Sequence, residues 1–413
     1  MKNCLDISGH IKLEGSKSIL NRVLIIASYL TNPLKIHNPS SCEDIATMSD
    51  NLSKLGIVFE KSEDAWIVKP TRSFHNSEKL YIHDSGTAYR FLTARIAAEK
   101  NSKCKIDISA QLKKRPIKQL IKVLNQMGTK ICLKQDSLII VGETLKGGSY
   151  KVEADVSSQF ISALLLIAPS YQNDLELLLE GEIVSRSYIE MTIKIMQDFG
   201  VIVNFTGNRL FIKKGQKYRE VKEYHIEPDY SSACYFWAIG ALSRSSISTN
   251  TIDNESLQPD YKFLSLLQKV GANITVEKNK ISVRRGELQG ISIDMINMPD
   301  QVPTLVTLML FANSKTTITK IDHLKYKESN RIAVLVTELS RIGVDISYQN
   351  GKLIINPLEK VVGNETLITY NDHRLVMAFS ILKMIFSQIE ISDTHSVEKS
   401  YPSFMIDLQS LKH

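Results

Sequence analysis

An amphipathic helix, a glycine and a β-branched strand follow one another five times along the chain, as in SKLGIVF and SRIGVDI. The glycines recur at intervals of 72, 72, 71 and 72 residues, at Gly56, Gly128, Gly200, Gly271 and Gly343. Glycine suits the left-handed position that ends many helices. A polar turn after each one predicts two short strands. The spacing therefore predicts a repeat of about seventy residues.

A second set of six helices is predicted upstream of these segments. The helices are apolar nearly all round, rich in small residues, and begin near Ser18, Thr87, Ser158, Ser232, Gln301 and His373. Helices of this kind are expected inside a domain. Their polar residues gather at the N-terminal ends.

Six repeats account for the chain and predict an α/β fold of two similar domains. The sixth repeat ends at residue 413, after its second helix and before a strand pair. We expect the N-terminal segment NCLDISGHIKLEG to supply that pair. The predicted domains are 15–226 and 1–14 plus 227–413, with crossings near residues 14–16 and 226–228. A cleft between them is the expected active site.

Composition supports a folded protein outside the membrane. The chain has 413 residues, 43% hydrophobic and 23% charged, which excludes disordered and collagen-like classes. Its longest apolar stretches fall far short of the roughly 20 residues that a membrane-spanning helix needs. The N-terminus shows no pattern of a secretory or transit peptide, so we expect a cytoplasmic protein.

The net charge of +7 suits either nucleic acid or small anionic substrates. The lysines form no polybasic block. The cysteines show no metal-ligand spacing, which predicts reduced thiols and no metal site; they are Cys4, Cys42, Cys104, Cys132 and Cys234.

Basic residues recur where helices begin, and helix N-termini themselves attract anions. A single Lys or Arg is usually a solvated surface charge, but recurrence at one structural position predicts an anion-binding cleft. These residues are Lys17, Arg22, Arg90, Arg115, Arg186, Lys327, Arg331, Arg374 and Lys399.

Two acidic residues stand among these cations. Asp300 precedes the fifth buried helix and Glu328 lies between Lys327 and Arg331. Asp300 is either a helix N-cap or a proton acceptor for a substrate hydroxyl. Glu328 is either an ion-pair partner or a proton-transfer group. His373 is a further candidate.

Eight motifs, in order, resemble one family, the 5-enolpyruvylshikimate-3-phosphate (EPSP) synthases. They are GSKSILNR (15–22), DSGTAYRF (84–91), KRPI (114–117), SSQF (157–160), SRSYIEMT (185–192), MPD (298–300), KESNR (327–331) and YNDHR (370–374). The match is collinear over essentially the whole chain. The resemblance implies two domains of three βαβαββ repeats around buried helices, the inverse α/β barrel of the enolpyruvyl transferases.

The resemblance also implies an activity and a site. The family transfers the enolpyruvyl group of phosphoenolpyruvate to the 5-hydroxyl of shikimate 3-phosphate, in chorismate and aromatic amino acid biosynthesis, without a cofactor and as a monomer. Implied contacts to shikimate 3-phosphate are Lys17, Ser18, Arg22, Ser157, Ser158, Gln159, Ser185, Tyr188, Asp300, His323 and Lys327. Implied contacts to phosphoenolpyruvate are Lys17, Gly86, Arg115, Gln159, Arg331, Arg374 and Lys399. The implied catalytic groups are Asp300, Glu328 and Lys17.

The chain departs from the family pattern at three positions. Asp84 stands where most members carry Asn, Phe91 replaces a frequent Pro or Leu, and His323 replaces a frequent Asn. An acid beside an anion pocket weakens phosphate binding unless Arg90 or Lys17 compensates for it. These departures bear on affinity more than on reaction class.

Two other functions fit the sequence less well. The sister transferase that acts on UDP-N-acetylglucosamine usually opens with a Lys-Asn pair and carries Cys, less often Asp, in a later Arg-rich loop. This chain has Ser16-Lys17-Ser18 and a loop of Lys113, Lys114 and Arg115. A non-catalytic anion or nucleic-acid binder would show aromatic platforms or a basic stripe, whereas the aromatics lie mainly in apolar segments.

Overall fold

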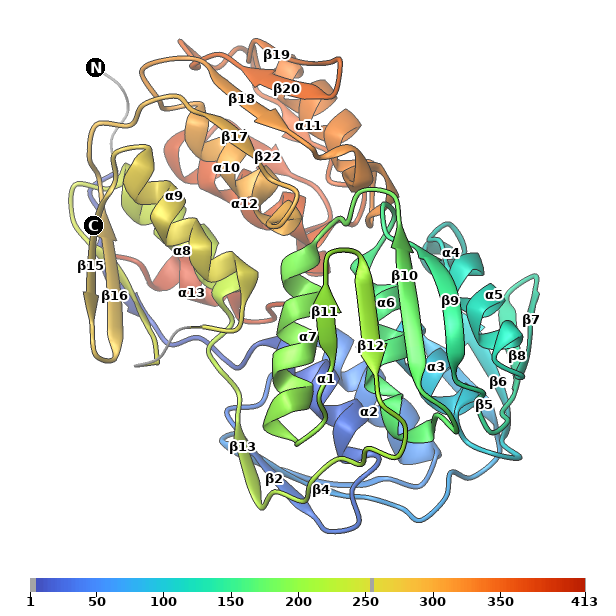
Figure 1. Ribbon diagram of the computed structural model, residues 1–413. Coiled ribbons are helices and arrows are strands. Elements are labelled where there is room, and N and C mark those ends of the chain that lie inside the picture. Colours follow the sequence, from blue (N-terminus) through green and yellow to red (C-terminus); the bar gives the residue numbers. More distant parts are fainter. Residues whose placement is uncertain (1–4, 253–255, 413) are drawn as a thin grey trace. The chain divides into compact units, whose positions relative to one another are not determined.

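The computed structural model describes residues 5–252 and 256–412, so Cys4 and the start of the expected N-terminal strand pair lie outside it. The chain forms successive repeats in the order βαβαββ (Figure 1). The first three repeats are β1 (Gly9–Ile11), α1 (Lys17–Ala27), β2 (Leu34–His37), α2 (Glu43–Lys54), β3 (Val58–Lys61), β4 (Ala65–Lys69); β5 (Ser77–Ile82), α3 (Gly86–Ala97), β6 (Lys103–Ile108), α4 (Ala110–Lys113), α5 (Lys118–Gln126), β7 (Lys130–Lys134), β8 (Ser137–Val141); and β9 (Gly148–Glu153), α6 (Ser158–Leu166), β10 (Leu175–Glu180), α7 (Arg186–Asp198), β11 (Asn204–Thr206), β12 (Arg209–Ile212).

The last three repeats follow the same order, and the sixth ends after its second helix. They are β13 (Glu223–His225), α8 (Tyr230–Leu242), β14 (Ile247–Asn250), α9 (Phe263–Lys269), β15 (Asn273–Glu277), β16 (Lys280–Arg284); β17 (Ser292–Asp294), α10 (Val302–Met309), β18 (Thr316–Thr319), α11 (Arg331–Arg341), β19 (Ile346–Gln349), β20 (Lys352–Ile355); and β21 (Thr366–Leu367), α12 (His373–Ile385), β22 (Glu390–Ile391), α13 (Phe404–Ser410). Short 3₁₀ helices interrupt the loops: η1 (Ala168–Ser170), η2 (Pro259–Lys262), η3 (Pro299–Gln301), η4 (Asp322–Tyr326) and η5 (Thr394–Lys399).

The chain divides into two compact units. The N-terminal unit is Gly15–Ile226, and the C-terminal unit combines Met1–Glu14 with Glu227–His413. Five sheets have four strands in one arrangement, in which a parallel pair is followed by an antiparallel hairpin, for example β5-β6-β8-β7. The sixth sheet is the pair β21-β22. The fold is thus built from several small separate sheets, and no closed barrel forms among residues 5–252 and 256–412.

The first strands of the first and fourth repeats change places. β1 pairs in parallel with β14, while β13 pairs in parallel with β2. The expected N-terminal strand pair is therefore wrong, because residues 5–14 contribute one strand and it completes the fourth repeat's sheet. β1 takes this place because the strand before α8, β13, lies in the other unit. The edge of β14 would otherwise have no parallel partner.

The five repeat glycines end their helices as the sequence predicts. All five have positive φ, between +81° and +115°. At Gly56 the amide donates to Ser53 O and the next amide donates to Leu52 O, and the same pair of bonds recurs at each of the other four. This is the Schellman arrangement, which satisfies helix carbonyls that would otherwise lack partners. It turns each second helix directly into its hairpin.

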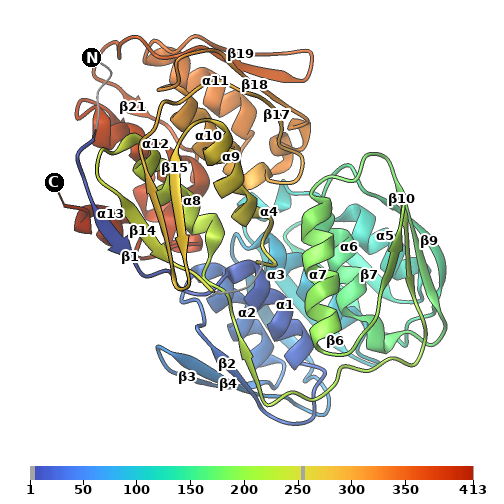
Figure 2. The same ribbon diagram turned by 60° about the vertical axis from the view of Figure 1, so that its left-hand side comes forward.

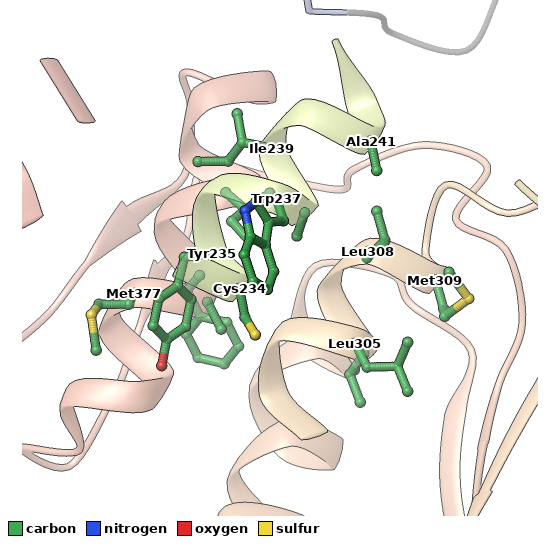
Figure 3. Close-up of a cluster of buried hydrophobic side chains, with 14 of the residues drawn as sticks. Cys234, Tyr235, Trp237, Ile239, Ala241, Leu305, Leu308, Met309 and Met377 are labelled. Carbon is green, nitrogen blue, oxygen red and sulfur yellow. The ribbon is translucent and has the colours of Figure 1, made fainter. Parts of the chain in front are cut away.

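The buried helices form the core of each unit, with the sheets around them (Figures 1 and 2). Helices α1, α3 and α6 pack on one another in the N-terminal unit, as do α8, α10 and α12 in the C-terminal unit. Every residue of α8 is buried. Trp237 and Cys234 of α8 belong to the same hydrophobic cluster as Leu305 and Leu308 of α10 (Figure 3). Burial stabilises each large side chain by about 1.5–3 kcal/mol. No described helix is long and apolar enough to cross a bilayer.

Candidate active site

In the N-terminal unit, several of the implied site residues lie where the three buried helices begin. Helix α1 starts at Lys17, α3 at Gly86 and α6 at Ser158. The amino group of Lys17 lies 2.7 Å from the carboxylate of Asp44, in the first turn of α2. Asp44 was not predicted as a site residue, because only the packing of α1 on α2 brings this acid to Lys17.

Arg22 lies one turn further along α1 and is buried. Its guanidinium donates to Thr192 Oγ1 at 2.7 Å and to the carbonyls of Ser18 and Tyr188 at 2.6 and 3.4 Å. Burial lowers its pKa to about 10, so it stays charged at neutral pH. The ring of Phe91 lies 5.4 Å below the guanidinium. This departure from the family pattern therefore supports Arg22 through a cation–π contact.

Gly86 leaves the start of α3 open to a guanidinium. A Cβ atom at this position would lie 2.4 Å from Arg115 Nη1, so Arg115 packs directly on the glycine backbone. Arg90 donates to the Gly86 carbonyl at 3.0 Å from the buried side. Any side chain at position 86 would push Arg115 away. The carboxylate of Asp84 accepts from the Ser109 hydroxyl at 2.5 Å.

The start of α6 adjoins that of α3. Ser157 caps α6 by accepting from the Gln159 amide at 3.3 Å, and Gln159 Nε2 donates to Thr87 Oγ1 at 3.2 Å. Ser185, buried, precedes α7 with φ of +54°, and its carbonyl accepts from the Tyr188 amide. Arg186, by contrast, pairs with Glu190 at the surface at 2.9 Å.

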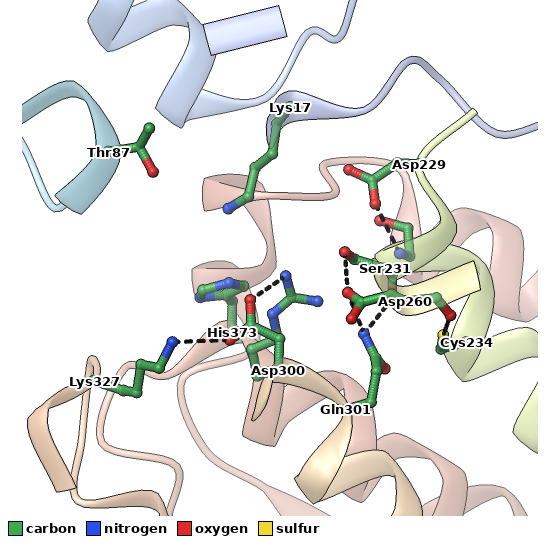
Figure 4. Close-up of polar contacts among 12 residues, drawn as sticks. Lys17, Thr87, Asp229, Ser231, Cys234, Asp260, Asp300, Gln301, Lys327 and His373 are labelled. Carbon is green, nitrogen blue, oxygen red and sulfur yellow. Dashed lines mark hydrogen bonds and ion pairs between the residues drawn. The ribbon is translucent and has the colours of Figure 1, made fainter. Parts of the chain in front are cut away.

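In the C-terminal unit, three cations surround the carboxylate of Asp300. Lys327 Nζ lies 3.4 Å from it, Arg331 Nη1 3.0 Å and Arg374 Nη2 3.2 Å. Figure 4 shows Lys327 pointing toward Asp300. Burial opposes the ionisation of Asp300, but the charges of Lys327, Arg374 and Arg331 outweigh it and hold its pKa well below the usual value. Asp300 is therefore a carboxylate at neutral pH.

Glu328 forms a second buried cluster beside this one. It accepts from Arg331 Nη2 at 2.9 Å and from Lys399 Nζ at 3.1 Å. The guanidinium of Arg331 is also held by Asp372, through Nε at 2.8 Å and Nη2 at 3.2 Å. Asp372 caps α12 by accepting from the Arg374 amide. The motif YNDHR contained Asp372, yet its role as the partner of Arg331 was missed, because 41 residues separate the two.

The two histidines named from the sequence are both buried in this unit. Burial and then the charge of Lys327 lower the pKa of His323 to about 4, so its ring is neutral at neutral pH. His373 Nδ1 lies 4.0 Å from Asp372 Oδ1. Asp260 is held by the Ser231 hydroxyl and by Gln301 Nε2, and burial followed by the charge of Asp300 raises its pKa (Figure 4).

Each unit thus offers cations with fixed orientation, buried or half-buried, at the starts of packed helices. Such groups bind phosphates and carboxylates strongly, because little reorganisation is needed and water is partly excluded. In the C-terminal unit two carboxylates, Asp300 and Glu328, stand among the cations. The arrangement is therefore suited to binding anions.

Comparison with solved structures identifies the fold as that of the enolpyruvyl transferases. An EPSP synthase from Acinetobacter baumannii matches with a TM-score of 0.80 and 21% identity over 99% of both chains. The enolpyruvyl transferase NikO from Streptomyces tendae matches with a TM-score of 0.78 and 14% identity, over 99% of this chain and 97% of that one.

Sequence comparison then identifies the family. The family model for EPSP synthase (3-phosphoshikimate 1-carboxyvinyltransferase) matches residues 2–408. Proteins named 3-phosphoshikimate 1-carboxyvinyltransferase from Haemophilus influenzae and Actinobacillus pleuropneumoniae are 34% and 33% identical, each over 98% of this chain and 96% of the relative. The chain belongs to the EPSP synthase family and is a transferase.

Proposed function

We propose that this protein transfers the enolpyruvyl group of phosphoenolpyruvate to the 5-hydroxyl of shikimate 3-phosphate, giving 5-enolpyruvylshikimate 3-phosphate and phosphate. The observation that carries the proposal is the carboxylate of Asp300 held by Lys327, Arg331 and Arg374 at the start of a buried helix. Membership of the family over nearly the whole chain supports the same reaction.

The reaction needs a base for the hydroxyl and a proton for the enol carbon. The hydroxyl oxygen attacks C2 of phosphoenolpyruvate while C3 gains a proton, which gives a tetrahedral adduct. The adduct then loses a proton from C3 and expels phosphate from C2, which restores the double bond. Asp300 accepts the hydroxyl proton, and Glu328 with Lys17 handles the proton at C3 and the departing phosphate.

Substrate binding itself would make Asp300 a better base. The charges of Lys327, Arg374 and Arg331 hold its pKa well below the ordinary value. The phosphate and carboxylate groups of the substrates compete for Lys327, Arg331 and Arg374, so the field of these cations at Asp300 weakens. The pKa of Asp300 then rises toward a value suited to proton abstraction.

Phosphoenolpyruvate is assigned to Lys17, Gly86, Arg115, Gln159, Arg331, Arg374 and Lys399. Shikimate 3-phosphate is assigned to Lys17, Ser18, Arg22, Ser157, Ser158, Gln159, Ser185, Tyr188, Asp300, His323 and Lys327. Both sets draw on both units. We therefore propose one active site to which each unit contributes part, and which substrates complete. Cationic donors from both units would offset the mutual repulsion of two phosphates and two carboxylates.

One assay tests the reaction. Phosphate release is followed with phosphoenolpyruvate plus shikimate 3-phosphate, with phosphoenolpyruvate alone, and with UDP-N-acetylglucosamine as acceptor. Release that requires shikimate 3-phosphate is the expected result. Release with the nucleotide sugar instead would assign the sister activity, and no release with either acceptor would leave anion binding alone.

The proposal also covers the location, the oligomeric state and the cofactor use of the protein. The protein acts in the cytoplasm as a monomer, on small-molecule substrates, and its chemistry needs neither a metal nor an organic cofactor. Turnover that survives exhaustive chelation, together with a monomer mass from light scattering, is expected. Loss of turnover on chelation would contradict the metal-free mechanism.

A further inference from the structure

We propose that His37, Glu223 and His225 form a binding site for a zinc-class divalent ion, outside the residues assigned to enolpyruvyl transfer. All three belong to the N-terminal unit. His37 ends β2, and Glu223 and His225 are the two ends of β13. Their nearest ligand atoms all lie within 4.8 Å of one another.

Strand pairing brings the three side chains together. In the parallel pair β2–β13, His225 is directly opposite His37. Glu223 is two residues before His225, so alternation along the strand puts both side chains on one face. The imidazoles of His37 and His225 stack with centroids 4.2 Å apart, and His37 Nε2 lies 3.0 Å from Glu223 Oε2. The pairing thus brings together residues 186 positions apart in the chain.

The donor set matches a borderline divalent ion. Two imidazoles and one carboxylate are ligands typical of Zn²⁺, and a water can complete a tetrahedral site. An ion bound through a ring nitrogen lies in the plane of that ring. Since the planes of His37 and His225 are only 6° from parallel, one ring turns about its side-chain bonds when the ion binds. The ion then replaces the His37–Glu223 hydrogen bond.

Exposure gives the ion access to this site. Glu223 and His225 are exposed, and the His37 side chain keeps 24% of its surface. Lys35, opposite Glu223, is a nearby positive charge that reduces the affinity. A bound ion would fasten β13, a three-residue edge strand, to β2 beside the crossing at Ile226.

Metal titration of the full chain tests the site. The Cys132→Ser background is used, because Cys132 is an exposed thiol that also binds soft metals. Calorimetry with Zn²⁺ is expected to show one equivalent bound per chain, and Co²⁺ a visible spectrum of a tetrahedral site. His225→Ala and His37→Ala should each weaken Zn²⁺ binding at least about 10-fold. Loss of an outer-shell partner alone already costs about 10-fold in metal affinity. Glu223→Gln should weaken it as well.

The matched control is His10→Ala, a histidine on the edge strand β1, outside the cluster. It should bind Zn²⁺ as the parent does. Circular dichroism and melting of the metal-free variants establish that they fold, and Zn²⁺ should raise the melting temperature of the parent but not of His225→Ala. Phosphate release by His225→Ala should stay at the parent level. Equal Zn²⁺ affinity in the parent, His225→Ala and His37→Ala, or no saturable equivalent, would overturn the site and leave a simple stacked pair.

Discussion

At the scale of single residues, the C-terminal cluster is a set of matched charges. Arg331 contacts Asp300, Glu328 and Asp372 at once, and its own side chain is 1% exposed. Burial disfavours the charged form of Arg331, but the charges of Asp372, Glu328 and Asp300 raise its pKa above the ordinary value. Removing one acid therefore frees cations to bind substrate anions, while removing Arg331 leaves acids buried without compensation.

Replacing Asp300 with Ala should lower kcat by about 10² or more, the usual contribution of a general base. Binding of shikimate 3-phosphate should survive, because Lys327, Arg331 and Arg374 lose a competitor for the substrate's anionic groups. The phosphate-release rate and calorimetric binding measure the two effects separately. Asp300→Asn, which keeps the size of the side chain, should behave alike. Near-normal turnover in either variant would remove Asp300 from the mechanism.

His323 should make stability depend on pH between about 6.5 and 4. An unfolded histidine has a pKa of about 6.5, whereas burial lowers the folded pKa to about 4. As the pH falls through this window the unfolded chain gains a proton that the folded protein rejects, so stability is lost. Going from about pH 7 to about pH 5 should cost on the order of 2 kcal/mol through this group.

Urea unfolding at both pH values, for the wild type and His323→Asn, measures this loss. The variant should lose less stability on acidification. His83→Asn, at an exposed histidine, serves as the control and should follow the wild type. If His323→Asn loses as much stability as the wild type, the His323 ring is not kept neutral by burial.

At the scale of the elements, each repeat depends on a glycine that reverses the chain after its second helix. The structure confirms the sequence prediction at all five positions. The starts of the six buried helices fall within two residues of the predicted positions. Both features depend on local chemistry, since a left-handed end and an all-apolar stretch are set by neighbouring residues.

Alanine variants at two glycines of the C-terminal unit allow the stability cost of backbone strain to be compared with that of a steric clash. Both Gly343→Ala and Gly271→Ala force alanine into positive φ, which costs roughly 1–2 kcal/mol. At position 343 the new Cβ meets a methyl of exposed Val362 at 2.9 Å, which can move. At position 271 it meets the Glu287 carbonyl oxygen at 2.2 Å, in the backbone. Urea unfolding should show a clearly larger loss for Gly271→Ala, and equal losses would contradict this account.

At the scale of the whole molecule, the chain passes twice between its two units, and each passage carries one strand. β1 completes a sheet of the C-terminal unit, and β13 completes one of the N-terminal unit. The chain connects the two units at residues 14–15 and 226–227. Hinge motion at short connections between two domains is a common way in which a protein encloses a ligand.

If both units serve one pair of substrates, binding should draw them together. Small-angle scattering should then show a smaller radius of gyration with shikimate 3-phosphate than without it. Inorganic phosphate at the same ionic strength is the control, because it screens charge without linking the two sets of residues. Unchanged dimensions with the substrate would argue against closure.

The sequence by itself determined the repeat, the buried helices, the family and most of the residues that cluster in each unit, because these follow from local patterns and short motifs. It did not reveal that Asp372 holds Arg331, that Asp44 pairs with Lys17, or that β1 joins β14, and it predicted a strand pair where one strand lies. Those contacts join segments 27 to 238 residues apart. Tertiary structure decided these contacts, because an ion pair or a sheet edge finds its partner only once the helices have packed. The pKa values of Asp300 and His323 also depend on the charges and burial that this packing creates.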